Sequence, residues 1–303
     1  MPQRDLRHGV YLTLLASLIW GTSFPGAEWG LRYVGNDVLF LWLRFLVASV
    51  VTLSVVLLVG KFSFSVMKEP VIWLIGGFNA AGFILQYVGL VYTTASKTAL
   101  LVDINVVAVA IVSYFAFRER LSRPQLLGVV VGSLGVVLVT SDKGLSFSSS
   151  ELLGDILAYL AGWSWAFFIV LSKKTLARRT AVEISSGAIA SCTLFLAPVV
   201  AYLALTDNAD LAVGLNGWLA AVYLGVFCTS VATLLWAMGL EGVSATASAT
   251  IMLVEVVTAL VIAFALLDES LRLTAAVGAA CVLAAIYLVS ASEPAETTKV
   301  KPI

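Results

Sequence analysis

The sequence is dominated by apolar stretches that follow one another, with short polar interruptions, from residue 10 to residue 291. Each is about 20 residues long, enough for a helix to cross the hydrocarbon core of a bilayer. Only helices or closed barrels satisfy their backbone groups in lipid, and these stretches are too long for barrel strands. The pattern therefore predicts ten membrane-spanning helices, at residues 10–30, 38–59, 71–92, 97–117, 124–141, 151–173, 182–205, 214–236, 245–267 and 273–291.

The charge content excludes several classes of protein. Hydrophobic residues make up 60 % of the 303 residues and charged residues 12 %, against about 45–50 % and about 25 % in soluble domains. The 18 basic residues are matched by 18 acidic ones, so no basic surplus is left to bind nucleic acid. The composition is that of a multi-pass membrane protein.

Catalytic and metal-binding patterns are missing from the sequence. His8 is the one histidine, and Cys192, Cys228 and Cys281 lack metal-ligand spacing. There is no Walker A loop and no G-x-S-x-G elbow. We therefore expect no metal, no cofactor, no disulfide and no catalytic residue, and ATP is not the direct source of energy.

The chain contains an internal repeat. A shift of 150 residues pairs Gly89-Leu90 with Gly239-Leu240, Glu119 with Glu269 and Gly128 with Gly278, and a shift of 145 pairs Trp20 with Trp165. The repeats are residues 10–141 and 151–291, between an N-terminal tail (1–9) and a C-terminal tail (292–303). Gly128 and Gly278 are expected to form a packing seam, with a dimer contact as the alternative.

Each repeat has five spans, so the second enters the membrane with inverted orientation. The expected fold is an all-α membrane protein with ten transmembrane helices arranged as two inverted five-helix repeats. Inverted repeats are typical of secondary transporters, whose binding sites lie near the bilayer midplane.

The distribution of Lys and Arg predicts the orientation. Thirteen of the 18 fall on the side that holds both termini and four on the other. The side rich in Lys and Arg faces the cytoplasm, so both termini are expected there. The expected location is the inner or plasma membrane of a prokaryote.

Several segments together resemble the EamA-type family of the drug/metabolite transporter superfamily. They are LLASLIWGTSFPGAEWGLR (14–32), FLWLRFLVAS (40–49), GLVYTTASKTALL (89–101), FRERLSRPQLLGVVVGSLGVVLV (117–139) and, less closely, LAGWSWAFFIV (160–170), GLEGVSATASATIMLVE (239–255) and LLDESLRLTAAVGAACVLAAIYLVS (266–290). The resemblance implies a ten-helix carrier that exports amino acids or other small metabolites.

One feature departs from that family. Its members usually carry a proline midway through the fourth and ninth spans, where this chain has Val106 and Val256. Proline kinks a helix, so these two spans are expected to be straighter than usual.

Acidic and amide groups occur at membrane depth. Glu255 lies near the middle of the ninth span, where an acidic residue costs about 3 kcal/mol or more to insert. It is expected to face a central cavity and exchange a proton; the alternative is a neutral Glu bonded to a neighbouring helix. Its repeat partner is Asn105, and Asp103 lies one third of the way down the fourth span. All three are candidate substrate-binding residues.

Two basic residues are further candidates. Arg44 lies within the second span, where a structural pair with an acidic residue such as Glu28 is favoured over contact with a ligand. Lys97, at the outer end of the fourth span, is expected to extend outward, with ligand contact as the alternative.

Aromatic and amide side chains complete the candidate substrate site. Trp20 and Trp165, equivalent in the repeat, are expected to pack, and Trp163 to form a pocket wall. The third span carries the other candidates, which either line a central cavity or bond between helices: Asn79, Gln86 and Tyr87.

The sequence predicts a carrier that works by alternating access, as a monomer or homodimer in contact with membrane lipid. The expected substrate is a small polar, amino-acid-like metabolite, moved with proton coupling or down its own gradient. Efflux of lipophilic cations is the alternative, since acidic and aromatic groups attract cations. A membrane enzyme or a non-transporting scaffold is the alternative class.

Overall fold

The structure is a computed structural model that describes residues 6–58, 64–93, 95–103, 105–118, 121–141, 151–206, 212–266 and 273–292. These residues are almost entirely helical and include no β-strand beyond an isolated bridge between Val34 and Val213. The first half comprises α1 (Leu6–Gly21), α2 (Ser23–Leu31), α3 (Asp37–Leu58), η1 (Phe64–Lys68), α4 (Pro70–Tyr92), α5 (Ala95–Val102), α6 (Asn105–Phe117) and α7 (Arg123–Ser141). The second comprises α8 (Leu152–Thr175), α9 (Ala181–Leu205), α10 (Leu215–Tyr223), η2 (Leu224–Val231), α11 (Ala232–Leu240), α12 (Ala245–Met252), α13 (Val254–Leu266) and α14 (Leu273–Ser292).

These elements confirm the predicted all-α membrane fold. Nine helical segments of the described chain are long and apolar enough to cross a membrane, and α7 adds a shorter apolar helix over Arg123–Val139. Several spans consist of consecutive elements: α1 with α2, α5 with α6, α10 with η2 and α11, and α12 with α13.

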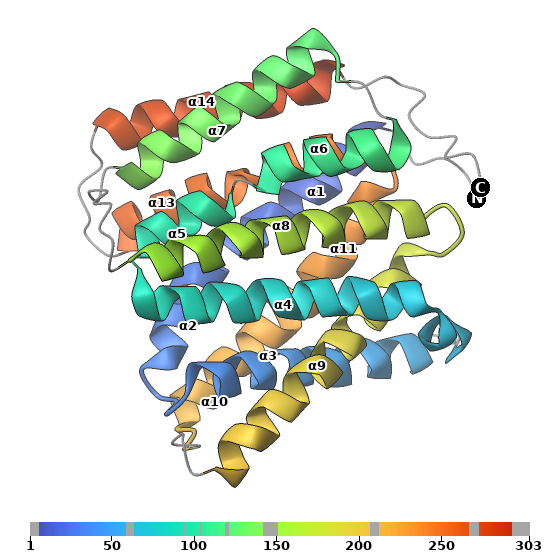
Figure 1. Cartoon of the computed structure of the whole chain (residues 1–303), viewed down its shortest axis with the longest axis vertical. Helices are drawn as coiled ribbons and strands as arrows, with labels where there is room; N and C mark the ends of the chain where they lie inside the picture. The colour runs from blue at the N-terminus through green and yellow to red at the C-terminus, as the bar shows by residue number, and fades with distance from the viewer. Residues whose placement is uncertain are drawn as a thin grey trace.

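The spans lie side by side in one bundle, with α7 and α14 paired along one side of it (Figure 1). The linkers gather at two opposite ends. We call one the Arg32 end, which holds the α2–α3 linker, and the other the Arg179 end, which holds the α8–α9 and α11–α12 linkers. At the Arg32 end, Gly35 and Gly214 exchange backbone hydrogen bonds with residues of the other half.

Glycine contacts reproduce the inverted repeat. A Cβ atom on Gly154 of α8 would lie 2.7 Å from the carbonyl oxygen of Gly89 in α4, and one on Gly9 of α1 would lie 2.9 Å from that of Gly239 in α11. Gly89 and Gly239 are 150 residues apart, and Gly9 and Gly154 are 145 apart. The same contact therefore occurs twice, at the Arg32 end and at the Arg179 end.

The predicted glycine seam lies between α7 and α14. A Cβ atom on Gly128 would lie 2.5 Å from Val289, and one on Gly278 would lie 2.6 Å from the carbonyl oxygen of Gly135. Small residues permit this close approach of two helices. Both glycines thus serve the packing of the two repeats against each other.

The fourth and ninth spans are each interrupted, although neither carries the proline usual in the family. α5 ends at Val102 and α6 begins at Asn105, while α12 ends at Met252 and α13 begins at Val254. At the two interruptions the amide of Val106 donates to Asp103 O (3.3 Å) and that of Val256 to Leu253 O (3.1 Å). Because these bonds span three residues rather than four, the backbone tightens locally without proline.

Candidate functional site

The two interrupted spans bring acidic groups to the interior of the bundle. Asp103 follows α5 directly and is buried, Asn105 opens α6 and is buried, and Glu255 lies half-buried in the first turn of α13. The carboxyl groups of Asp103 and Glu255 are near enough to interact electrostatically. Two carboxyl groups so placed repel each other when both are ionised, and a proton or other cation between them relieves the repulsion.

α1 packs against the Glu255 backbone. A Cβ atom on Gly21 would lie 2.9 Å from the Glu255 carbonyl oxygen and 2.4 Å from the side chain of Thr258. The Thr258 hydroxyl donates to Val254 O (2.9 Å). The close approach at Gly21 fixes the first turn of α13, and with it Glu255, beside the first span.

A second polar group lies where α1 and α3 meet η2. The eight residues of η2 form a π-helix, in which backbone bonds span five residues and the carbonyl groups are displaced; such turns are frequent at functional sites. The indole N–H of Trp20 donates to Cys228 O (2.8 Å), and Arg44 Nε donates to Thr229 Oγ1 (2.7 Å). Thr229 in turn donates to Leu224 O (3.0 Å).

Arg44 is a buried cation, with 6 % of its surface exposed. Its guanidinium carbon lies 5.4 Å from the ring centre of Phe83 and 6.0 Å from that of Phe45. Tyr87 and Cys192 lie within electrostatic range of it. The site therefore combines a charged planar group with aromatic walls and a phenol.

The pair expected between Arg44 and Glu28 does not form. Glu28 binds Arg32 instead, at 2.9 Å, with both side chains largely exposed. The two residues are four apart on or just beyond α2, so the local partner is reached without leaving the helix surface. Among the described residues no carboxylate pairs with Arg44.

The remaining candidates are spread over α4 and α8. Asn79 accepts a hydrogen bond from the indole N–H of Trp165 (3.3 Å), which bonds the two helices. Trp163 makes an edge contact with Tyr159, and Gln86 is half-buried. The side chain of Lys97 lies outside the part of the chain that the structure describes.

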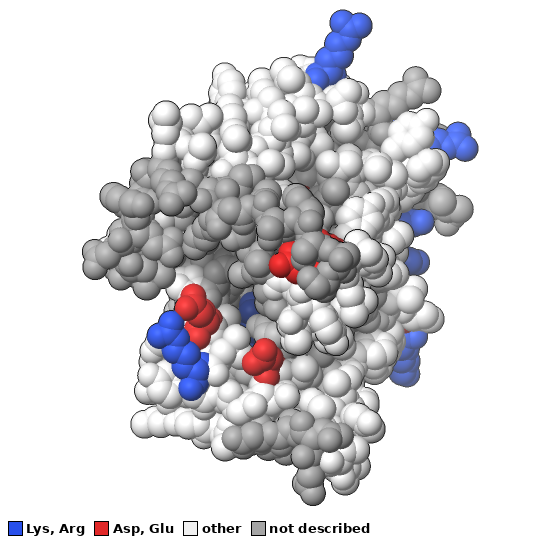
Figure 2. Space-filling model, turned by 60° about the vertical axis from the view of Figure 1, so that its left-hand side comes forward, with Lys and Arg blue, Asp and Glu red and all other residues white. Residues whose placement is uncertain are grey.

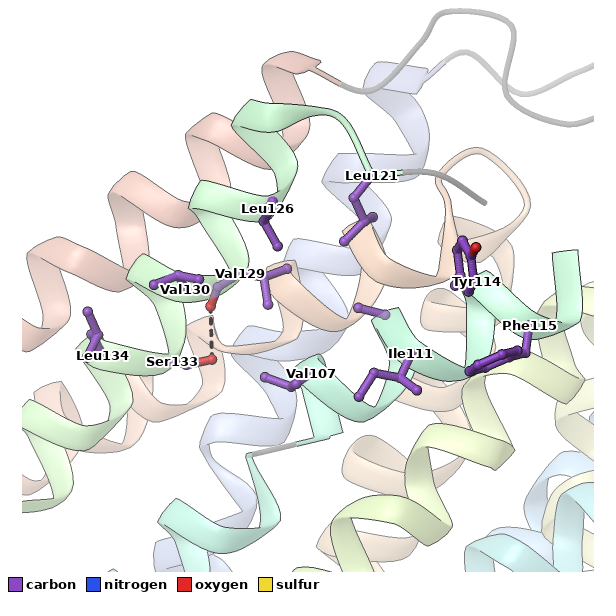
Figure 3. A pocket seen from close by; sticks show the side chains of 11 residues that line it. Val107, Ile111, Tyr114, Phe115, Leu121, Leu126, Val129, Val130, Ser133 and Leu134 are labelled. Carbon is purple, nitrogen blue, oxygen red and sulfur yellow. Dashed lines mark hydrogen bonds between the residues drawn. The ribbon is translucent and has the colours of Figure 1, made fainter. Parts of the chain in front are cut away.

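An apolar groove lies away from these residues. It is a hollow of about 700 Å³ between α6 and α7, lined almost wholly by apolar side chains (Figure 3). Two hydroxyl groups belong to its lining: that of Ser133 donates to Val129 O (2.9 Å), and the other is the phenol of Tyr114. The groove contains none of the candidate residues.

The two ends of the bundle differ. Seen with the Arg32 end brought forward, the surface is hollowed, with acidic groups around the hollow and basic surface inside it (Figure 2). At the Arg179 end lies a group of polar contacts that we call the clamp, in which Arg179 joins the second half of the chain to Glu69 of the first. They are Arg179 with Glu69 and Glu183, Lys173 Nζ with Leu240 O (2.7 Å), and the amide of Ala181 with Glu241 Oε1 (3.3 Å).

Sequence reasoning missed η2 and the clamp. Thr229 carries no signal beyond being a hydroxyl residue in an apolar span. The capping box of Thr180 and Glu183 at the start of α9 could have been found by its spacing. Within the described ranges no three His, Cys, Asp or Glu side chains come together as metal ligands.

Comparisons with known proteins agree with this architecture. The EamA-like transporter family matches residues 7–141 and 152–291. An uncharacterized transporter of Archaeoglobus fulgidus is 29 % identical over 93 % of this chain and 97 % of its own length. Proteins named probable amino-acid metabolite efflux pumps are 24 % identical in Salmonella typhimurium and 25 % in Escherichia coli, over 92 % and 91 % of this chain and 93 % of each relative.

A solved crystal structure superposes with a TM-score of 0.82 at 18 % identity, covering 93 % of this chain and 98 % of the other. This likeness shows the shared fold. The family match extends over both repeats and nearly the whole chain. The chain therefore belongs to the EamA-like transporter family and is a multi-pass membrane transporter.

Proposed function

We propose that this transporter exports small polar metabolites, amino acids or related compounds, by alternating access. In this proposal the Arg179 end faces the cytoplasm, as the distribution of Lys and Arg favours. The hollow at the Arg32 end and the clamp at the Arg179 end then correspond to a state open to the outside.

The acidic pair at the two interrupted helices is the observation that carries the proposal. Interrupted helices at equivalent places of inverted repeats are where such carriers hold their substrates and coupling ions. Asp103 and Glu255 lie there, on different repeats, and interact with each other. The pair supports exchange of a proton as the cavity opens from one side to the other.

The names of two relatives support the substrate class, since both are called probable amino-acid metabolite efflux pumps. Lipophilic cations are the second candidate, because the same acidic pair and the aromatic side chains near Trp20 attract cations. A growth-rescue screen with toxic amino-acid analogues beside cationic dyes separates the two. Resistance to dyes alone contradicts the amino-acid proposal.

Glu255→Gln tests the role of the acidic pair. The amide keeps the shape and the hydrogen bonding of the carboxyl group but cannot exchange a proton. Efflux from proteoliposomes, measured across a series of pH values, is expected to lose its pH dependence in this variant while the protein still purifies as a folded species.

Glu28→Gln is the matched control, because Glu28 is exposed at the Arg32 end and forms an ion pair there with Arg32. It is expected to keep the pH profile of the wild type. A Glu255→Gln variant that transports normally at every pH would defeat the role assigned to Glu255.

A further inference from the structure

The guanidinium group of Arg44 has an unused edge. Nε makes the one short bond, to Thr229 Oγ1, and Nη2 lies 3.5 Å from Cys228 O, at the limit of a hydrogen bond. No bond to Nη1 occurs among the described residues. An arginine carries five N–H donors, so most of those on this buried group have no partner of normal length.

A buried cation without a counterion is unfavourable, because it has lost its hydration and gained no opposite charge. Among the described residues, the groups in direct contact with Arg44 are two aromatic rings, a threonine hydroxyl and a peptide carbonyl, all of them neutral. Rings flanking the guanidinium hold its plane, and the bond from Nε to Thr229 fixes its rotation. The guanidinium group is thus held in position, and no carboxylate of the described chain forms an ion pair with it.

The free edge formed by Nη1 and Nη2 matches one kind of ligand. Two parallel N–H groups bind the two oxygens of a carboxylate in a fork, which gives both energy and geometric selectivity. The Tyr87 phenol, within electrostatic range of Arg44, adds a hydroxyl donor. A cationic ligand would instead be repelled.

Arg44 and Glu255 both lie near the last turn of α1. Trp20 reaches the Cys228 carbonyl that Arg44 approaches, and the next residue, Gly21, packs against the backbone of Glu255. Arg44 and Glu255 are thus both near the last turn of α1. That arrangement fits a ligand with a carboxylate at one end and an ammonium group at the other.

We propose that Arg44 binds the carboxylate of the transported metabolite, held in place by the π-helical turn η2, so that the carrier selects solutes bearing a carboxylate over amines and lipophilic cations. This inference rests on the proposed function and names the group by which that site recognises its substrate. It gives Thr229 the role of a positioning residue, since its hydroxyl orients the guanidinium without touching the ligand.

The test needs no variant in its first arm. Proteoliposomes containing the wild-type protein are loaded with a labelled mixture of the protein amino acids, and efflux is measured with either unlabelled amino acids or the corresponding amino-acid amides as competitors. The amides keep the ammonium group and the side chain but lack the carboxylate. We expect the amino acids to compete at concentrations about tenfold or more below those of the amides, the factor for losing a hydrogen bond to a charged group.

The second arm compares Arg44→Gln and Arg44→Lys with Arg32→Gln. Arg32 is the matched control because it is an exposed arginine paired with Glu28. Arg44→Gln is expected to lower efflux by about tenfold or more and to remove the preference for the carboxylate, Arg44→Lys to keep part of both, and Arg32→Gln to behave as wild type.

The outcomes separate the two proposals. If the wild type moves no amino acid in the mixture, the proposed function fails and the inference fails with it. If the wild type exports amino acids but the amides compete equally well, the inference is overturned while the proposed function stands. The wild-type competition decides this even if Arg44→Gln does not fold.

Discussion

Single residues show which parts of the site could be read from the sequence. The pairing of Trp20 with Trp165 follows from the repeat, and both indole groups do bond across the two halves, Trp20 to Cys228 and Trp165 to Asn79. The acceptor atoms could not be predicted, because they depend on how helices distant in sequence approach each other. The sequence identifies Arg44 as a charged residue inside a span. Its contact with Thr229 depends on η2, which no residue pattern predicts.

Arg179 is the residue that contributes most contacts to the clamp. Nε and Nη2 both donate to Glu69, and Nη1 donates to Glu183 (3.1 Å). The hydrogen bond to Glu69 raises the pKa of the Arg179 guanidinium. Because the folded-state pKa is raised, the stabilisation from this contact is fully present below the unfolded-state pKa and is lost only as pH rises through the folded-state pKa. Arg179 therefore stays charged throughout the physiological range.

Replacing Arg179 is therefore expected to destabilise the protein at neutral pH. In Arg179→Gln the carboxylates of Glu69 and Glu183 lose their shared cation and are left close together. The midpoint of thermal unfolding in detergent is expected to fall, and adding Glu69→Gln to that variant to restore part of the loss, as a double-mutant cycle measures. Arg178→Gln, at the exposed neighbouring position, is the control. Equal midpoints for the Arg178 and Arg179 variants would contradict a specific clamp.

The helical elements were predicted more completely than the site. All ten spans were located by hydropathy, with ends a few residues from those observed, because apolar length is fixed by the bilayer rather than by tertiary contacts. The interruptions at Asp103 and Leu253 were missed, since the expectation relied on proline as the cause of a kink. Tighter turns at Val106 and Val256 produce the same break, and nothing in the local residue types requires them.

The close packing of α7 against α14 can be tested by replacing glycines. A Cβ atom at Gly135 would lie 2.7 Å from the carbonyl oxygen of Gly278, which is backbone and cannot rotate away. Gly135→Ala is expected to lower the free energy of unfolding by about 1–3 kcal/mol through overpacking, measured by thermal or denaturant unfolding in detergent. At Gly77 the new atom would meet Phe195 at 3.4 Å, an ordinary contact. If Gly77→Ala and Gly135→Ala unfold at the same midpoint, α7 and α14 do not approach each other as closely at Gly135 as the structure has them.

For the whole molecule, the two ends share the contacts that follow from the repeat and differ in those that do not. The Gly89–Gly154 contact lies at the Arg32 end and its counterpart, Gly9–Gly239, at the Arg179 end. The clamp and η2 have no such counterpart: the stretch of α4 equivalent to η2 is an uninterrupted α-helix. Alternating access requires that each end of the molecule be open in one state and closed in the other. The clamp and η2, which have no counterpart in the first repeat, are the features by which the two halves depart from symmetry.

The orientation of the molecule is open to a direct test. Arg32 and Arg178 are both exposed and lie at opposite ends, so a cysteine at each reports on one side of the membrane. With the Arg179 end in the cytoplasm, an impermeant maleimide added to intact cells is expected to label Arg32→Cys and to label Arg178→Cys only after permeabilisation. The native thiols give little background, since Cys192 and Cys228 are buried and Cys281 is partly so. Labelling of Arg178→Cys in intact cells, with Arg32→Cys protected, would reverse the orientation. The hollow at the Arg32 end would then open to the cytoplasm, and the direction of transport would have to be reconsidered with it.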